Sequence, residues 1–295
     1  MRVNRLSDEA SLTTRDHYVV AGNPVQHSQS PFIHARFAEQ TGEQLSYDRL
    51  LCTAEGFEKS VREFAQSGGR GCNITMPFKF NAWRMASSVS ERAALAQACN
   101  VLRFDEPGAW YADNTDGVGL VRDIQNNARR LLAGTRVLML GAGGAAAGAL
   151  GPLLSAGPAE LVLANRSVDK AQALVDRHAA FAAAHGVELR AANLLDCGES
   201  FDVVINATAS SLGDAPVPVS SRVLKAGALA LDMAYGSSAL HYLAWAHQHG
   251  ATGRDGLGML VEQAAEAFFV WRGVRPDTAP VLAALLQRVA AANTK

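Results

Sequence analysis

An apolar strand that runs directly into a glycine-rich turn and an alanine-rich helix constrains this chain most. The strand covers residues 136–140, and the turn consists of Gly141, Ala142, Gly143, Gly144 and Ala145. The first glycine permits a tight bend, the second lets a pyrophosphate approach the backbone, and the helix amino terminus then faces the phosphates. A small residue at the third position, Ala146, lets the helix pack on the strand. The pattern predicts a dinucleotide-binding turn.

The residues after the next predicted strand, 160–164, indicate which dinucleotide would bind. An enzyme that uses NAD places Asp or Glu there, against the ribose hydroxyls. This chain has Asn165, Arg166 and Ser167 instead, followed one helical turn later by Lys170. Cationic and hydroxyl groups suit the 2′-phosphate of NADP, which a carboxylate would repel. The segment predicts NADP; the alternative is that Arg166 and Lys170 form only the solvated start of a helix.

Composition and charge exclude several classes of protein. A chain of 295 residues can form two domains, and its net charge of −1 argues against a nucleic-acid partner. The four cysteines, Cys52, Cys72, Cys99 and Cys197, lack C-x-x-C spacing, so we expect neither a metal site nor a disulfide framework. The sequence has no uninterrupted apolar run of about 18 residues and no signal-like amino terminus. We expect a cytoplasmic protein without a membrane partner.

Strand and helix patterns alternate along the chain, which predicts the α/β class. Predicted strands cover 17–22, 45–51, 71–76, 136–140, 160–164, 187–191, 202–207 and 229–234, with a hairpin formed by 99–104 and 110–112. Predicted helices cover 31–41, 55–67, 119–132, 169–185, 238–249, 257–272 and 278–292. Two α/β units in succession imply a cleft between them.

Polar residues in the first unit follow strands or precede helices, where open α/β sheets bind ligands. Ser28 and Ser30 precede a predicted helix, with Ser30 as its expected N-cap. Thr75 and Lys79 flank Pro77 at a strand end, and Asp116 lies in a polar turn after the hairpin. Taken singly, each has a commonplace alternative as a helix cap, a strand hydroxyl, a surface charge or a turn residue.

Taken together and in order, these segments resemble the shikimate dehydrogenase family. The resemblance extends over residues 17 to 293, and the Pro-Phe-Lys and Asn-Thr-Asp-Gly elements are its most specific parts. The matching segments are Ser28 to Pro31, Asn73 to Lys79, Asn114 to Gly117, Gly141 to Ala145, Asn165 to Ser167, Asn206 to Thr208 and Asp255 to Gln263. One departure is Ala98-Cys99-Asn100-Val101, where Ala-Val-Asn-Thr is common; it keeps the asparagine and loses a hydroxyl.

The resemblance implies reduction of 3-dehydroshikimate to shikimate with NADPH, in the route to chorismate and the aromatic amino acids. It assigns the substrate carboxylate to Ser28 and Ser30, with Tyr235 nearby. It assigns the ring hydroxyls to Thr75, Lys79, Asn100, Asp116 and Gln263, all hydrogen-bonding types. Beyond the glycine turn and the 165–170 segment, it assigns cofactor contacts to Asn206, Thr208, Met233 and Gly256.

The family's chemistry makes Lys79 the proton donor to the C3 oxygen and Asp116 the group that fixes the lysine. Asp116 would raise the pKa of Lys79, whereas desolvation and the positive nicotinamide of the oxidised cofactor would lower it. The sign of the net shift stays open. The two groups are expected to titrate as a coupled pair.

The resemblance also predicts two domains with a C-terminal return. Residues 1–16 form a flexible extension, 17–115 a substrate-binding domain, 116–256 a Rossmann-like NADP-binding domain, and 257–295 helices that pack on the substrate domain. A monomer or a homodimer is expected. Two alternatives stay open: a quinate/shikimate dehydrogenase paralogue, whose substrate carries an additional C1 hydroxyl, and a catalytically silent NADPH-binding regulator on the same scaffold.

Overall fold

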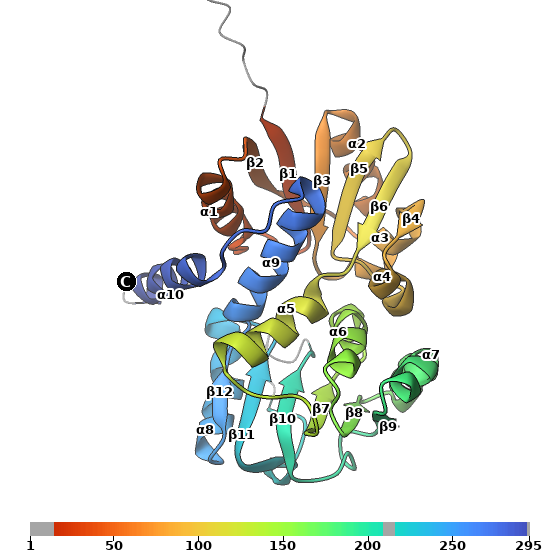
Figure 1. Ribbon diagram of the computed structural model, residues 1–295, viewed down its shortest axis with the longest axis vertical. Helices are drawn as coiled ribbons and strands as arrows, with labels where there is room; N and C mark the ends of the chain where they lie inside the picture. Colours follow the sequence, from red (N-terminus) through yellow and green to blue (C-terminus); the bar gives the residue numbers. More distant parts are fainter. Residues whose placement is uncertain (1–14, 209–215, 294–295) are drawn as a thin grey trace, which may run out of the picture.

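The computed structural model describes residues 15–208 and 216–293 and contains two six-stranded sheets, one above the other in Figure 1. The first sheet has the order β2-β1-β3-β5-β6-β4. Its strands are β1 (Asp16–Gly22), β2 (Leu45–Leu51), β3 (Gly69–Ile74), β4 (Ser88–Val89), β5 (Val101–Glu106) and β6 (Ala109–Asp113). β5 is antiparallel to both β3 and β6, so β3 and β6 run in the same direction and end at the same edge.

The second sheet has the order β12-β11-β10-β7-β8-β9, and all its neighbouring strands are parallel. Its strands are β7 (Arg136–Leu140), β8 (Glu160–Ala164), β9 (Glu188–Ala192), β10 (Phe201–Asn206), β11 (Leu224–Asp232) and β12 (Thr252–Arg254). β7 and β8 are nearly continuous apolar runs because helices cover both faces of such a sheet. The predicted Rossmann-like unit is confirmed.

Helices cover the faces of both sheets (Figure 1). They are α1 (Ser30–Thr41), α2 (Phe57–Gln66), α3 (Lys79–Met85), α4 (Glu91–Ala96), α5 (Asp116–Arg122), α6 (Gly144–Ser155), α7 (Val168–Ala184), α8 (Leu240–Gln248), α9 (Leu257–Arg272) and α10 (Ala279–Asn293). Successive side chains of β1 point to opposite faces of the first sheet and enter two different cores. Tyr18 and Val20 pack with α1 and α9, whereas Val19 and Ala21 pack with α2 and α3.

The chain crosses between the sheets twice. α5 leads from β6 to the second sheet, and α9 leads from β12 back to the first, where Phe268 and Trp271 join the core around Tyr18. α5 and α9 pack against each other between the two sheets (Figure 1). Side chains from both sheets can therefore meet along these two helices.

The predicted helix over 119–132 is wrong at both ends. α5 begins at Asp116, and a π-helical turn (Asp123–Asn127) follows it. The amide of Ala128 donates to the Asp123 carbonyl at 2.8 Å, and Arg129 adopts a φ of 52°, which ends the helix. The Asp123 carboxylate, which is fully buried, pairs with Arg254 of β12. Tertiary pairing thus overrides the local helical pattern.

Two further observations bear on the predicted classes. Within residues 15–208 and 216–293, no helix is both long and apolar enough to cross a bilayer. The same residues include no group of three or more His, Cys, Asp or Glu side chains placed to hold a metal ion.

β1 begins at Asp16, the last residue of the segment predicted as an extension. Arg70 and Arg272 bind the Asp16 carboxylate and fix the start of this strand.

Candidate active site

A lysine–carboxylate pair lies where β3 and β6 end at the same edge. Lys79 is the first residue of α3 and Asp116 is the first residue of α5. The Lys79 Nζ donates a hydrogen bond to Asp116 Oδ2, and their side chains are 15% and 6% exposed. The two residues predicted to manage the proton are therefore paired and largely removed from water.

Asn100 is the hub of the polar cluster around this pair. Its Nδ2 lies 2.9 Å from Asp116 Oδ1, 2.9 Å from Thr115 Oγ1 and 3.0 Å from Gln263 Oε1. Its Oδ1 accepts from the Thr115 amide at 2.7 Å. The structure thus brings together Lys79, Asn100, Asp116 and Gln263 and adds Thr115, which the sequence motif contains but which was assigned no role.

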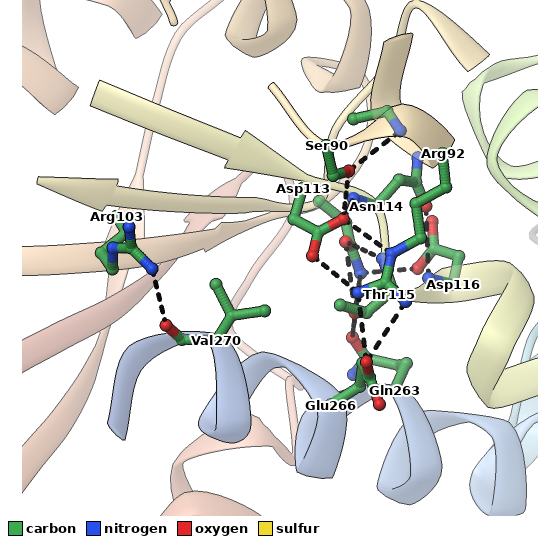
Figure 2. A network of polar contacts seen from close by, with 12 residues as sticks. Ser90, Arg92, Arg103, Asp113, Asn114, Thr115, Asp116, Gln263, Glu266 and Val270 are labelled. Carbon is green, nitrogen blue, oxygen red and sulfur yellow. Dashed lines mark hydrogen bonds and ion pairs between the residues drawn. The ribbon is translucent and has the colours of Figure 1, made fainter. Parts of the chain in front are cut away.

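An arginine clamp, formed by Arg92, Asp113 and Glu266, adjoins this cluster (Figure 2). Arg92 of α4 binds both carboxylate oxygens of Asp113, at 2.7 and 2.6 Å, and donates to Glu266 at 3.2 Å. Burial opposes the charge of Arg92, but Asp113 and Glu266 outweigh it and raise the pKa of Arg92. Asp113 precedes the Thr115–Asp116 segment, and Glu266 lies one turn beyond Gln263. The clamp therefore fixes α9 against the loop.

Asn114 connects the loop to the second sheet's helix α6. Its Nδ2 donates to the Ala98 carbonyl at 2.9 Å, and its Oδ1 accepts from the Asp116 amide at 3.2 Å. The side chain is fully buried against Gly148 of α6, where a Cβ would lie 2.4 Å from both amide atoms. The sequence motif contains Asn114 but gives it no role, and sequence reasoning missed the arginine clamp because its residues have no local pattern of their own.

The residues predicted to bind a carboxylate meet at the start of α1. The Ser30 amide donates to Ser28 Oγ at 3.2 Å, and Gln29 occupies the N-cap position without a side-chain cap bond. The prediction that Ser30 caps this helix is therefore wrong, because Ser28 takes that amide and the helix begins one residue early. Burial raises the pKa of Tyr235, against a hydrogen bond with the Gln29 backbone that lowers it. Tyr235 follows β11, so both sheets contribute here.

Thr75 lies at the end of β3, near Tyr47 and Asn73, two residues to which the sequence assigned no role. Thr75 follows β3, and its amide donates to the Ala21 carbonyl at 2.9 Å. The Tyr47 hydroxyl donates to Asn73 Oδ1 at 2.7 Å, and Asn73 Nδ2 donates to the Asn100 carbonyl at 3.2 Å. Burial raises the pKa of Tyr47 well above its usual value. A buried chain of hydrogen bonds thus links the strand ends.

The glycine turn has the shape expected of a pyrophosphate cradle. Gly141 adopts a φ of 105°, and a Cβ there would lie 2.9 Å from the Ala207 carbonyl oxygen. A Cβ on Gly143 would meet no atom within 4 Å, so its backbone is open to a ligand. Gly144 and Ala145 begin α6, while Ala142 packs on the core. A Cβ on Gly144 would lie 3.1 Å from Lys79 Cβ, which brings the turn beside the lysine–carboxylate pair.

The segment after β8 carries two exposed positive charges. Asn165 Nδ2 donates to the Ser167 carbonyl at 2.9 Å, and Ser167 is the N-cap residue of α7. Arg166 and Lys170 are exposed and form no ion pair with any residue in the described ranges. Guanidinium and ammonium groups without counter-ions fit a 2′-phosphate.

The four remaining predicted cofactor residues gather where β10 and β11 end. Thr208 Oγ1 donates to Asn206 Oδ1 at 2.7 Å, and the Met233 amide donates to the Asn206 carbonyl at 2.9 Å. A Cβ on Gly256 would lie 2.4 Å from the Met233 carbonyl oxygen. Because Ala207 also contacts Gly141, these residues adjoin the glycine turn.

Three family models match the chain. The shikimate dehydrogenase substrate binding domain matches residues 20–102, the shikimate/quinate 5-dehydrogenase model residues 123–219, and the shikimate 5′-dehydrogenase C-terminal domain residues 256–286. Shikimate dehydrogenase (NADP(+)) from Methylibium petroleiphilum is 60% identical and aligns with 98% of this chain and 100% of its own length.

Solved structures share the fold over nearly the whole chain. The Ael1 enzyme from Pseudomonas putida is 48% identical with a TM-score of 0.81, over 92% of this chain and 98% of its own. Shikimate 5-dehydrogenase from Thermus thermophilus, solved with NADP(H) and shikimate, is 28% identical with a TM-score of 0.78, over 93% and 99%. With 60% identity to a shikimate dehydrogenase along almost its entire length, this chain belongs to the shikimate dehydrogenase family of NADP-dependent oxidoreductases.

Proposed function

We propose that this chain catalyses the reversible, NADP(H)-dependent interconversion of 3-dehydroshikimate and shikimate on the route to chorismate. One observation carries the proposal: the Lys79–Asp116 pair lies beside the cofactor turn at Gly144 and within the Asn100–Gln263 polar cluster. A polyhydroxylated ring held by that cluster would lie next to a nicotinamide. Family membership and the relatives' cofactor support the assignment.

The proton chemistry falls to Lys79. NADPH, when bound, supplies the hydride that reduces the C3 carbonyl. Lys79 donates a hydrogen bond to the C3 oxygen, stabilises the negative charge that develops there, and delivers a proton to it. Asp116 holds the amine in position through Oδ2, while Asn100 holds Asp116 through Oδ1. In the oxidative direction Lys79 takes the proton back.

Groups that follow strands of both sheets orient the substrate. The hydroxyls of Ser28, Ser30 and Tyr235 bind its carboxylate, next to the amino terminus of α1. Thr75, Lys79, Asn100, Asp116 and Gln263 bind its ring hydroxyls. The buried hydrogen bonds of the cluster fix these groups before substrate arrives, which reduces the reorganisation that the reaction needs.

The residues that would hold the cofactor lie along one edge of the second sheet. Gly141 to Ala145 bind the pyrophosphate at the start of α6, and Arg166, Ser167 and Lys170 bind the 2′-phosphate, with Asn165 ordering their segment. Asn206, Thr208, Met233 and Gly256 flank the remainder. Residues 17–115 and 257–295 form the substrate-binding unit, and residues 116–256 form the NADP-binding unit. The enzyme acts in the cytoplasm as a monomer or homodimer, without nucleic-acid or membrane partners.

One assay tests the function. Purified protein is mixed with shikimate or quinate and with NADP or NAD, in all four pairs, while the absorbance of the reduced nicotinamide is followed. We expect the fastest turnover with shikimate and NADP. Faster turnover with quinate and NAD would favour the quinate-using paralogue, and NADPH binding without turnover of any pair would favour the silent regulator.

A further inference from the structure

An exposed arginine, Arg49, lies beside the segment proposed to hold the substrate carboxylate. Arg49 stands near the carboxyl end of β2, opposite Val20 of β1, and its Nη2 donates to the Ser28 carbonyl at 2.6 Å. No carboxylate in the described ranges pairs with it. The adjacent Asp48 binds His17 at 3.1 Å and projects from the other face of the strand. Most of the N–H groups of Arg49 therefore remain available.

The charge of Arg49 reaches the groups around that segment. Burial raises the pKa of Tyr235 and of Tyr47, and the positive charge of Arg49 acts against burial at both hydroxyls. Tyr235 also contacts the Gln29 backbone, and Tyr47 contacts the Ser30 side chain. Arg49, Ser28, Ser30 and Tyr235 therefore lie close to one another at the strand ends.

Hydroxyl groups alone do not select a charged ligand, because they hydrogen-bond a carboxylate, an ester or an amide. We infer that Arg49 is a specificity-determining residue that makes the site prefer an anionic substrate. Its charge attracts the carboxylate that Ser28, Ser30 and Tyr235 then bind, and so favours both encounter and affinity. This inference rests on the proposed function, which assigns the carboxylate to these hydroxyls.

The test compares charge-removing and charge-keeping variants. In Arg49→Gln we expect the KM and the Kd for shikimate to rise about 3- to 10-fold, the effect of one partly exposed charge, with kcat close to that of the parent. Arg49→Lys should recover most of this loss. Arg70→Gln is the matched control, because it removes the same charge from the same sheet at the amino end of β3, where Arg70 pairs with Asp16. It should leave KM unchanged.

A neutral substrate separates charge from loop positioning. Methyl shikimate should have the same KM in the parent and in Arg49→Gln. Raising the salt from about 50 to about 500 mM should increase the KM for shikimate in the parent and much less in Arg49→Gln. An equal loss for shikimate and its methyl ester would show that Arg49 only holds the Ser28 backbone, which would refute the inference. If Arg49→Gln is active with an unchanged KM for shikimate, the inference about Arg49 is refuted and the proposed function is unaffected. If the parent enzyme is inactive with shikimate, both the inference and the proposed function are overturned.

Discussion

Replacement of Gly148 by alanine tests how the cofactor helix is coupled to the catalytic loop. A Cβ at this position would lie 2.4 Å from both Nδ2 and Oδ1 of Asn114. Ordinary contacts are about 3.5 Å, so the amide or α6 must move by about 1 Å. Asn114 is fully buried and bonded to the Ala98 carbonyl and the Asp116 amide, so it has no free space to rotate into.

The magnitude follows from three contributions. Forcing an extra methyl into a packed site costs about 1 to 3 kcal/mol. Stretching the two Asn114 hydrogen bonds costs about 1 kcal/mol more. Replacing glycine by alanine inside a helix returns about 1 kcal/mol. We therefore expect Gly148→Ala to lower the free energy of unfolding by about 1 to 3 kcal/mol, and to lower kcat by about 10- to 100-fold because Asp116 is displaced.

A double-mutant cycle in urea, with initial rates for each variant, measures this coupling. In an Asn114→Ala background the new methyl meets no amide, so Gly148→Ala should stabilise the protein by about 1 kcal/mol. The Kd for NADP shows which group moves to accommodate the methyl. It should stay constant if the Asn114 side chain moves, and rise if helix α6 moves. If Gly148→Ala has the same effect in both backgrounds, or leaves stability and kcat at parental values, the proposed coupling through Asn114 is incorrect.

Three further predictions concern individual side chains. Arg166→Ala should weaken NADP binding by about 1.5 to 3 kcal/mol, measured by calorimetry, and barely change NAD binding; equal losses would show that Arg166 does not contact the 2′-phosphate. Lys79→Ala should lower kcat by about 10²- to 10⁴-fold with NADP affinity intact, and Asp116→Asn should resemble it; a rise in KM alone would make Lys79 an anchor. Burial acts to raise the pKa of Glu266, but the positive charges of Arg275, Arg92 and Arg122 outweigh it and lower this pKa below its usual value of 4.5. The ionised carboxylate therefore stabilises the fold above that pH, and this stabilisation is lost as the pH falls. Urea unfolding from pH 7 to pH 3 should show a flatter acid loss in Glu266→Gln, and identical slopes would contradict this.

The sequence predicts those parts of the site that are formed by residues close together in the chain. The strand-to-turn-to-helix pattern at Gly141 and the Thr75–Lys79 and Asn114–Asp116 segments follow from local rules, because turns and strand ends leave signatures within a few residues. Arg92 and Arg49 belong to no such local signature. Their partners, Glu266 and Ser28, lie 174 and 21 residues away, beyond the reach of a local pattern, and a lone arginine on a helix or strand resembles any solvated charge. The π-helical turn at Asp123 was missed for the same reason, since Arg254 sets its geometry from a distance.

The return of α9 to the first sheet sets the order in which the chain can become stable while it is being made. Residues 16–113 leave the ribosome well before Phe268 and Trp271, which complete the core around Tyr18. The second sheet is complete once β12 has emerged, so it can fold earlier. Until α9 arrives, the nascent first sheet exposes an apolar face, which is the kind of surface that molecular chaperones bind.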